Sequence, residues 1–146
     1  MCSSDLVPEE NLVLTAGVFY PTKVPTLDGV AEKATPAGID SWFAVMRAVL
    51  DEADGETRFV PSHGRAVMKK GQLEGYVSYL QGVWDGVKRA RGSGRTLEQA
   101  KADLPLTAFP AVAKLPNEDL RGTEWENLDI HGHNIERLWK VLDRPA

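Results

Sequence analysis

The side chains of this sequence most able to bind a metal or to move a proton near neutral pH are three histidines. His63 lies in a Pro-Ser-His-Gly turn, residues 61–64, directly after a short apolar run. A loop histidine that follows a strand is well placed to point its imidazole into a cleft. A metal site needs three or four donors, so the turn alone is also typical of a solvated loop residue. The residues leave both interpretations of His63 open.

His131 and His133 stand one residue apart and could share a metal if a third donor lay near them. Because alternate residues of an extended segment point to one side, both rings could then face the same ion. The pair also lies at the start of a helix that the following apolar pattern indicates. We therefore predict that these two histidines serve helix capping or lie on the surface.

The other polar candidates offer no acid–base pair. The carboxylates either end a predicted helix in solvent-facing positions or are spread through an irregular acidic stretch: Asp51, Glu52 and Asp54, and Glu118, Asp119, Glu124 and Glu126. Three tryptophans, Trp42, Trp84 and Trp139, fall on apolar helical stripes, which indicates core packing. Trp125 lies outside any periodic pattern and would either line a cleft or plug it.

Two short strands are expected to position His63. Residues 11–20, "NLVLTAGVFY", are apolar and rich in β-formers, and their short length favours a buried central strand. Residues 21–36 carry three prolines and a glycine, so they are predicted to form a long loop of the kind that often serves function. The second strand, residues 57–60, ends at Pro61 and leads into the histidine turn.

Two long helices flank this second strand in the prediction. The first is capped by Thr35, starts at Pro36, ends near Gly55 and carries one apolar face: Ile39, Trp42, Phe43, Met46, Val49 and Leu50. The second ends at Gly92 and Gly94 and has the clearest amphipathic pattern: Leu73, Tyr76, Val77, Leu80, Val83, Trp84 and Val87.

Two shorter helices follow. A capping box at Thr96 and Gln99 opens one that runs through about Asp103. After Pro105 the chain is expected to be irregular and fastened to the body by four apolar residues: Leu106, Phe109, Val112 and Leu115. Asn134 is the predicted cap of the last helix, whose apolar positions are Ile135, Leu138, Trp139 and Leu142.

The order of these elements predicts an α/β fold with few strands and about four helices. Two strands alone make a poor sheet, so the chain is expected to be part of a larger fold. The net charge of −4 is spread along the chain and favours no nucleic-acid partner. No apolar run is long enough for a membrane span, which predicts no membrane partner.

The opening hexapeptide "MCSSDL" equals the translation of the end of a common sequencing adapter read from a GTG start. We therefore expect residues 1–6 to be non-native and residues 7–146 to be the C-terminal portion of a domain. Because the only cysteine, Cys2, belongs to this hexapeptide, no disulfide or thiolate chemistry is then expected. With the native N-terminus expected elsewhere, a cytoplasmic and a periplasmic location both stay open.

The segment "FVPSHGRAVMKKGQLEGYVSYLQGVWDGVKRARGSGRTLEQAKADL" resembles the C-terminal part of metallo-β-lactamase-fold hydrolases. In that family an apolar strand ends in a Pro-Gly-His-Gly turn, which a long helix, a Gly-rich break and a short Leu-Glu-x-Ala helix follow. "NLVLTAGVFYPTKVP", "GIDSWFAVMRAVL" and "HNIERLWKVL" resemble other parts of it in the same order, so the likeness spans residues 10–142. Ser62 departs from the family's first turn glycine.

The resemblance implies the C-terminal half of a four-layered αβ/βα sandwich that hydrolyses a small-molecule substrate with a metal-activated water. His63 would be a ligand of zinc or another divalent metal. The family's His-x-His-x-Asp-His cluster belongs to an N-terminal half that this chain lacks, so the missing half is the expected partner and this chain alone is expected to be inactive. Residues 21–36 and 105–128 would shape the substrate mouth.

One further departure keeps alternatives open. Val18 stands where the family has a metal-bridging aspartate, and Asp28 lies further along the same loop. The chain could therefore be a degenerate family member that kept the fold without the metal. It could also be a small non-catalytic α/β binding protein in which His63 is incidental.

Overall fold

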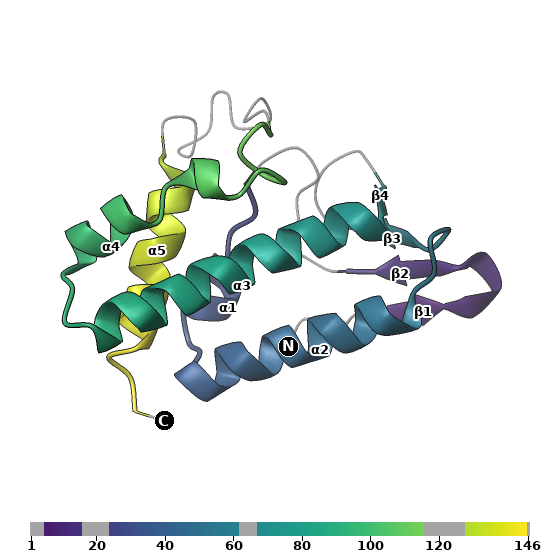
Figure 1. Cartoon of the computed structure of the whole chain (residues 1–146). Helices are drawn as coiled ribbons and strands as arrows, with labels where there is room; N and C mark the ends of the chain where they lie inside the picture. The colour runs from purple at the N-terminus through teal and green to yellow at the C-terminus, as the bar shows by residue number, and fades with distance from the viewer. Residues whose placement is uncertain (1–4, 16–23, 62–66, 116–127, 146) are drawn as a thin grey trace.

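A computed structural model of the chain describes residues 5–15, 24–61, 67–115 and 128–145 (Figure 1). Within these ranges it has a small mixed sheet and five α-helices, so the predicted α/β character is confirmed. No helix in the described ranges is long and apolar enough to cross a membrane.

The sheet has four strands in the order β1 (Asp5–Val7), β2 (Leu12–Leu14), β3 (Arg58–Val60) and β4 (Met68–Lys69). The two inner strands, β2 and β3, are parallel, and each outer strand pairs antiparallel with its neighbour. The predicted central position of the first apolar run is thereby confirmed for Leu12–Leu14. The prediction missed β1 and β4 because strands of two or three residues are too short to show alternation.

β1 includes Asp5 and Leu6, which belong to the hexapeptide expected to be adapter-derived. A 3-10 helix, η1 (Pro8–Glu10), and the left-handed backbone of Asn11 turn the chain from β1 into β2. The origin of the hexapeptide stays a prediction.

Helix α2 (Pro36–Glu52) follows the local signals at its start. Thr35 caps it by accepting a hydrogen bond from the backbone N–H of Gly38 at 3.2 Å, and Pro36 occupies the first turn. Of the six predicted apolar positions, four are buried and two, Trp42 and Val49, are half-buried against the core. The helix ends at Glu52, three residues before the predicted end at Gly55.

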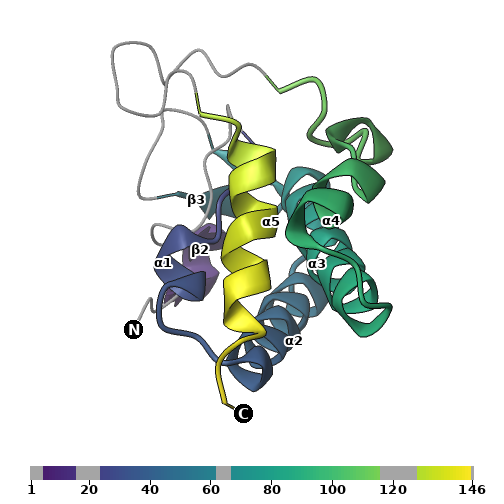
Figure 2. The ribbon, with the colours of Figure 1, turned by 90° about the vertical axis from the view of Figure 1, so that its left-hand side faces the viewer.

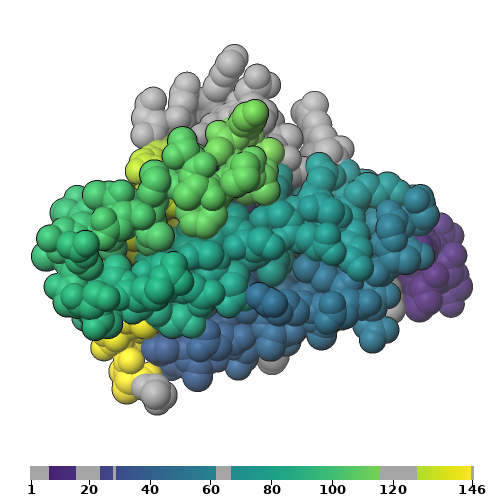
Figure 3. Space-filling view, in the orientation of Figure 1, coloured from purple at the N-terminus to yellow at the C-terminus, as the bar shows by residue number. Residues whose placement is uncertain are grey.

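Helix α3 (Lys70–Gly92) is the central element of the molecule and packs against α2, α4, α5 and the two strands β3 and β4 (Figures 1 and 3). All seven predicted apolar positions are buried. Tyr79 and Ala90 are buried as well, because α4 and α5 cover a second side of the helix. Among the glycines of α3, Gly86 has the nearest neighbour, because a Cβ at this position would overlap the side chain of Leu104.

Helix α4 (Leu97–Asp103) opens with the predicted capping box, in which Thr96 and Gln99 each bond the other's backbone N–H. The irregular segment after it contains η3 (Leu106–Ala108), and Val112 is buried there. Leu106, Phe109 and Leu115 are half-buried against the core, so the predicted packing of this segment onto the body is confirmed.

Two predictions were wrong, one about the loop after β2 and one about the start of the last helix. The loop expected at residues 21–36 contains a one-turn helix, α1 (Asp28–Ala31). The last helix, α5 (Ile130–Val141), begins before its predicted cap, and Asp129 caps it instead by accepting from the N–H of Gly132 at 3.0 Å. Figure 2 shows α5 between α1 and α4, and it contacts both as well as α3.

The three tryptophans on helical stripes pack against the core as predicted. Trp84 is completely buried, and its indole N–H donates to Asp40 at 2.7 Å. Trp42 meets Phe43 edge-on, and Trp139 lies half-buried under the guanidinium of Arg91. Trp125 lies outside the described residues.

Candidate functional site

The predicted metal ligand His63 lies outside the described residues, and so does Val18. The residues on either side of this turn are described: Pro61 is buried directly after β3, and β4 begins at Met68. Asp28 forms the first residue of α1. The role predicted for His63 therefore rests on the sequence and on the position of the strand that precedes it.

The parallel strands β2 and β3 leave the sheet side by side. The backbone N–H of Thr15 donates to the carbonyl of Val60 at 2.9 Å, and the buried Thr15 hydroxyl donates to the same oxygen at 3.3 Å. The described chain therefore reaches the carboxyl ends of both strands at neighbouring positions, Thr15 and Val60. In open α/β sheets, ligands bind outside this carboxyl edge.

The histidine pair was placed wrongly in part. His131 is buried and is neither a cap nor a surface residue, whereas His133 is half-buried and accepts from the Nε–H of Arg137 at 3.3 Å. In the described part of the chain, no three His, Cys, Asp or Glu side chains lie close enough to hold a metal together. The pair therefore does not complete a metal site with described residues.

His131 belongs to a buried network with Tyr79 of α3 and Asn134 of α5, which the sequence predictions did not include. The His131 Nδ1 lies 3.0 Å from the Tyr79 hydroxyl, and its Nε2 lies 2.6 Å from the carbonyl oxygen of Leu104. The Asn134 amide donates to the Tyr79 hydroxyl at 3.0 Å and to the carbonyl of Pro25 at 2.7 Å. Its oxygen accepts from the backbone N–H of Leu27 at 3.3 Å.

A sequence signal for this network existed. His131 and Asn134 lie three residues apart and share the helical face of Ile135 and Leu138, so the apolar period can be followed backwards through both polar residues. Asn134 was predicted to be a cap because asparagine is common at that position.

Burial raises the pKa of the Tyr79 hydroxyl, which therefore stays protonated and able to donate.

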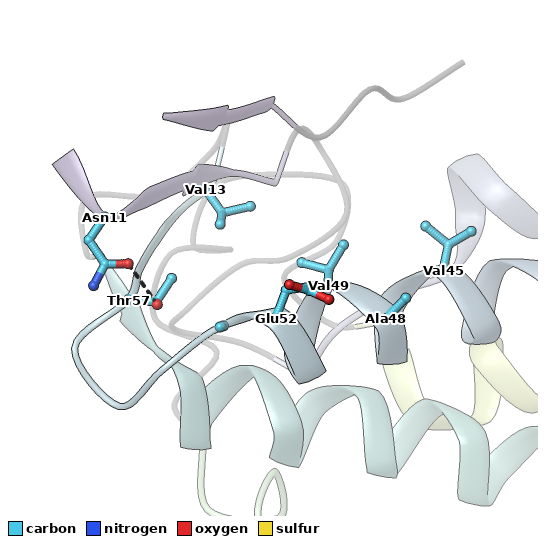
Figure 4. A pocket seen from close by; sticks show the side chains of 8 residues that line it. Asn11, Val13, Val45, Ala48, Val49, Glu52 and Thr57 are labelled. Atoms are coloured by element: carbon cyan, nitrogen blue, oxygen red, sulfur yellow. Dashed lines mark hydrogen bonds between the residues drawn. The ribbon is translucent and has the colours of Figure 1, made fainter. Parts of the chain in front are cut away.

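A second feature is a hollow of about 400 Å³ between β2 and the last turns of α2 (Figure 4). Its walls are mainly apolar, with Val45 exposed by 60%. The Glu52 carboxylate has no ion pair or hydrogen bond with the described residues, and it lies beside Val49 at the hollow. The lining residues are Asn11, Val13, Val45, Ala48, Val49, Glu52, Ala53 and Thr57.

Two residues that line the hollow, Asn11 and Thr57, belong to a hydrogen-bonded cluster around Asp54. The Asp54 carboxylate accepts from the Asn11 amide at 3.1 Å and from the Thr57 hydroxyl at 2.8 Å. It also accepts from the backbone N–H groups of Glu56 and Thr57. These hydrogen bonds, that from Asn11 first and those from Thr57 next, lower the pKa of Asp54 to about 2. The loop between α2 and β3 is thereby tied to the start of β2.

No family model matches this chain, and a search of curated proteins gives no significant match. The comparisons therefore add no family assignment to the α/β fold.

Proposed function

We propose that this chain is the C-terminal part of a metal-dependent hydrolase of the metallo-β-lactamase type, with His63 as one metal ligand. The observation that carries the proposal is that the parallel strands β2 and β3 end side by side, where the Thr15 N–H bonds the Val60 carbonyl. His63 follows Val60 by three residues, so the sequence places an imidazole directly after the carboxyl end of a central parallel strand.

The apolar character of both faces of the sheet supports a larger sandwich. Val13 and Phe59 are directly paired and buried on one face. Leu14 and Val60, one residue further along each strand, must point to the other face, and Leu14 is 39% exposed. Parallel strands are normally covered on both faces. A second layer that contacts Leu14 and Val60 fits the four-layered αβ/βα sandwich.

The proposed chemistry is hydrolysis of a small-molecule substrate. When bound, zinc or another divalent ion would lower the pKa of a coordinated water so that hydroxide forms near neutral pH. An imidazole nitrogen of His63 suits such an ion. The other ligands would come from the N-terminal half of the same domain, which is the proposed partner, so this chain alone is expected to be inactive. Residues 21–36 and 105–128 would border the substrate mouth.

The test begins with the DNA upstream of the codon for Val7. The proposal expects an in-frame His-x-His-x-Asp-His about a hundred or more residues earlier, and a full-length protein that binds zinc. In that protein His63→Ala should lower the zinc content and the hydrolytic rate, whereas His133→Ala should leave both near the parent's values. A stop codon close upstream, or unchanged zinc content in His63→Ala, would contradict the proposal.

The same full-length protein distinguishes the hydrolase from the alternative of a degenerate family member that kept the fold without the metal. Val18 in place of the bridging aspartate motivates that alternative. A folded full-length protein that binds no zinc at all would favour it over the hydrolase.

The hollow beside α2 favours a second candidate, a non-catalytic binding protein. Its volume falls in the range of small-molecule sites, and its walls are apolar. Glu10 and Glu56 pair with Arg58 and Lys69, but Glu52 has no ion pair in the described part of the chain. An apolar molecule that carries a cationic group would complement this combination.

Hexyltrimethylammonium, hexyl sulfate and hexanol test the second candidate, with binding followed by methyl shifts of Val13, Val45 and Val49. The binding-protein candidate expects the ammonium ion to bind best. Glu52→Gln should weaken the ammonium ion about 2- to 5-fold, as for an exposed ion pair, and leave hexanol unchanged. Asp51→Asn, one residue away, is the matched control. Equal binding of ammonium and sulfate would contradict this candidate.

A further inference from the structure

The buried network holds two segments that are far apart in sequence. Asn134 binds Pro25 and Leu27, directly before α1, and His131 binds Leu104 at the end of α4. The first segment lies within residues 21–36, and the second leads into residues 105–128. The proposed function assigns both of these ranges to the border of the substrate-binding site. The Tyr79 hydroxyl is the only atom of the described network that bonds both His131 and Asn134.

The backbone groups at the ends of this network fix the direction of the hydrogen bonds that they make. The carbonyl of Leu104 can only accept, so the His131 Nε2 carries a hydrogen. The carbonyl of Pro25 accepts and the N–H of Leu27 donates, which fixes the orientation of the Asn134 amide. Asn134 therefore donates to the Tyr79 oxygen. When the His131 ring carries its single hydrogen on Nε2, the Tyr79 hydroxyl donates its hydrogen to Nδ1.

Burial makes a half-broken network unfavourable. Tyr79, His131 and Asn134 are exposed by only 2%, 7% and 0%. If either neighbour of the hydroxyl moved away, a buried donor or acceptor would lose its partner, and such a loss costs more than the net gain from forming the bond. Neighbouring hydrogen bonds in a buried chain also strengthen one another.

The packing of aromatic rings reinforces the link to the second segment. The Phe109 ring meets Tyr79 edge-on with centroids 5.2 Å apart and lies 5.7 Å from the His131 ring. Residues 104–109 therefore contact both rings of the network, through the Leu104 carbonyl and the Phe109 side chain.

We propose that the Tyr79 hydroxyl couples residues 24–27 to residues 104–109, so that the two segments open and order together. As a device for positioning the substrate mouth, this coupling rests on the proposed function; the coupling itself does not. A molecule that orders one segment would then favour binding at the other, because the opening of both shares one equilibrium.

Hydrogen exchange of the backbone amides tests the coupling in the chain as it stands, without metal or substrate. His131→Phe removes the bonds to Leu104 and Tyr79 and touches none of the bonds to residues 24–27. The proposal nevertheless expects faster exchange at the Leu27 amide, by about 5- to 10-fold, in step with the Ala108 and Phe109 amides. His131→Gln, which keeps one donor and one acceptor, should recover part of the protection.

Tyr79→Phe should accelerate both segments, and Tyr76→Phe on the same helix is the matched control for loss of a tyrosine hydroxyl. A His131→Phe variant that exchanges faster only at residues 104–109 would show two independent anchors and overturn the coupling. Equal effects of Tyr79→Phe and Tyr76→Phe would overturn it as well.

Exchange in the wild-type chain at low urea concentrations covers the case in which a variant does not fold. Coupling expects the Leu27, Ala108 and Phe109 amides to share one opening free energy and one urea dependence. Separate values would overturn it. This readout is independent of the upstream sequence and of zinc binding, so its failure is distinguishable from failure of the proposed hydrolase.

Discussion

The helical region, α3 to α5, and the sheet region, β1 to β4 with the last turns of α2, are built in different ways. In the helical region large side chains such as Trp84 are completely enclosed, and the polar atoms of Tyr79, His131 and Asn134 bond one another. In the sheet region the strands are two or three residues long, Val45 and Leu14 are exposed, and a hollow remains. The first arrangement leaves no buried side-chain N or O atom of the described residues without a hydrogen-bond partner. The second leaves apolar surface for another layer, a partner or a ligand.

The largest expected difference between the regions is in core truncation. Trp84→Ala should lower the free energy of unfolding by about 3–5 kcal/mol, because it removes a fully buried indole and leaves a cavity. Val45→Ala in the sheet region should change it by less than about 0.5 kcal/mol, because that side chain is mostly exposed. Urea unfolding followed by far-UV circular dichroism measures both. Comparable losses in the two variants would remove the distinction between the regions.

Two glycines of α3 test how closely the helical region is packed. Gly86→Ala should destabilise the protein by about 1–3 kcal/mol, because the added methyl group would overlap Leu104. Gly71→Ala meets nothing within 4 Å and should stabilise the helix by up to about 1 kcal/mol. The opposite signs should appear in the melting temperatures. If Gly86→Ala is neutral, α4 is held less tightly to α3 than the distances indicate.

The cap of α2 lies at the start of the helix, whereas the hollow is lined by its last turns. A change at Thr35 therefore tests the start of the helix separately from the hollow. Thr35→Ala should cost about 1 kcal/mol through loss of the bond to the Gly38 N–H, whereas Thr35→Ser should retain most of it. Thermal unfolding measures the pair. Equal losses in both variants would mean that the methyl group of Thr35, not its hydroxyl, stabilises the helix.

The smallest effect is expected at the exposed Asp54 cluster in the sheet region. Because the folded pKa of Asp54, about 2, lies below the ordinary aspartate value of 3.8, the cluster stabilises the fold above pH 3.8 and loses this contribution as the pH falls toward 2. The melting temperature should therefore fall less between pH 5 and pH 2 in Asp54→Asn than in the parent. Asp51→Asn, whose carboxylate is outside the cluster, should keep the parent's slope. The same slope in all three proteins would exclude the cluster as a stabilising element.

Local signals predicted the helices of the described chain well. Thr35 and Thr96 bond N–H groups three residues away, so the information for both helix starts lies within one turn. The apolar period of α3 was sufficient to identify all seven predicted buried positions. The start of α5 was wrong because two buried polar residues, His131 and Asn134, interrupted the apolar pattern that was being followed.

The candidate site was predictable only in its sequence position. His63 after the second strand is evident in the sequence, but the parallel pairing that brings Thr15 beside Val60 joins residues 45 positions apart. The hollow is lined from β2, α2 and the turn before β3, and no single segment carries a periodic signal for it.

The sequence by itself determined the α/β class, the caps of α2 and α4 and the apolar helix faces, because each depends on side chains within a few residues of one another. The tertiary structure decided which polar side chains are buried. The bonds from Asn134 to Leu27 and Pro25 cross 107 and 109 residues, and the contact of Tyr79 with His131 crosses 52. Such pairs form only after the helices pack, since burial requires each polar group to find a partner that the neighbouring sequence does not supply.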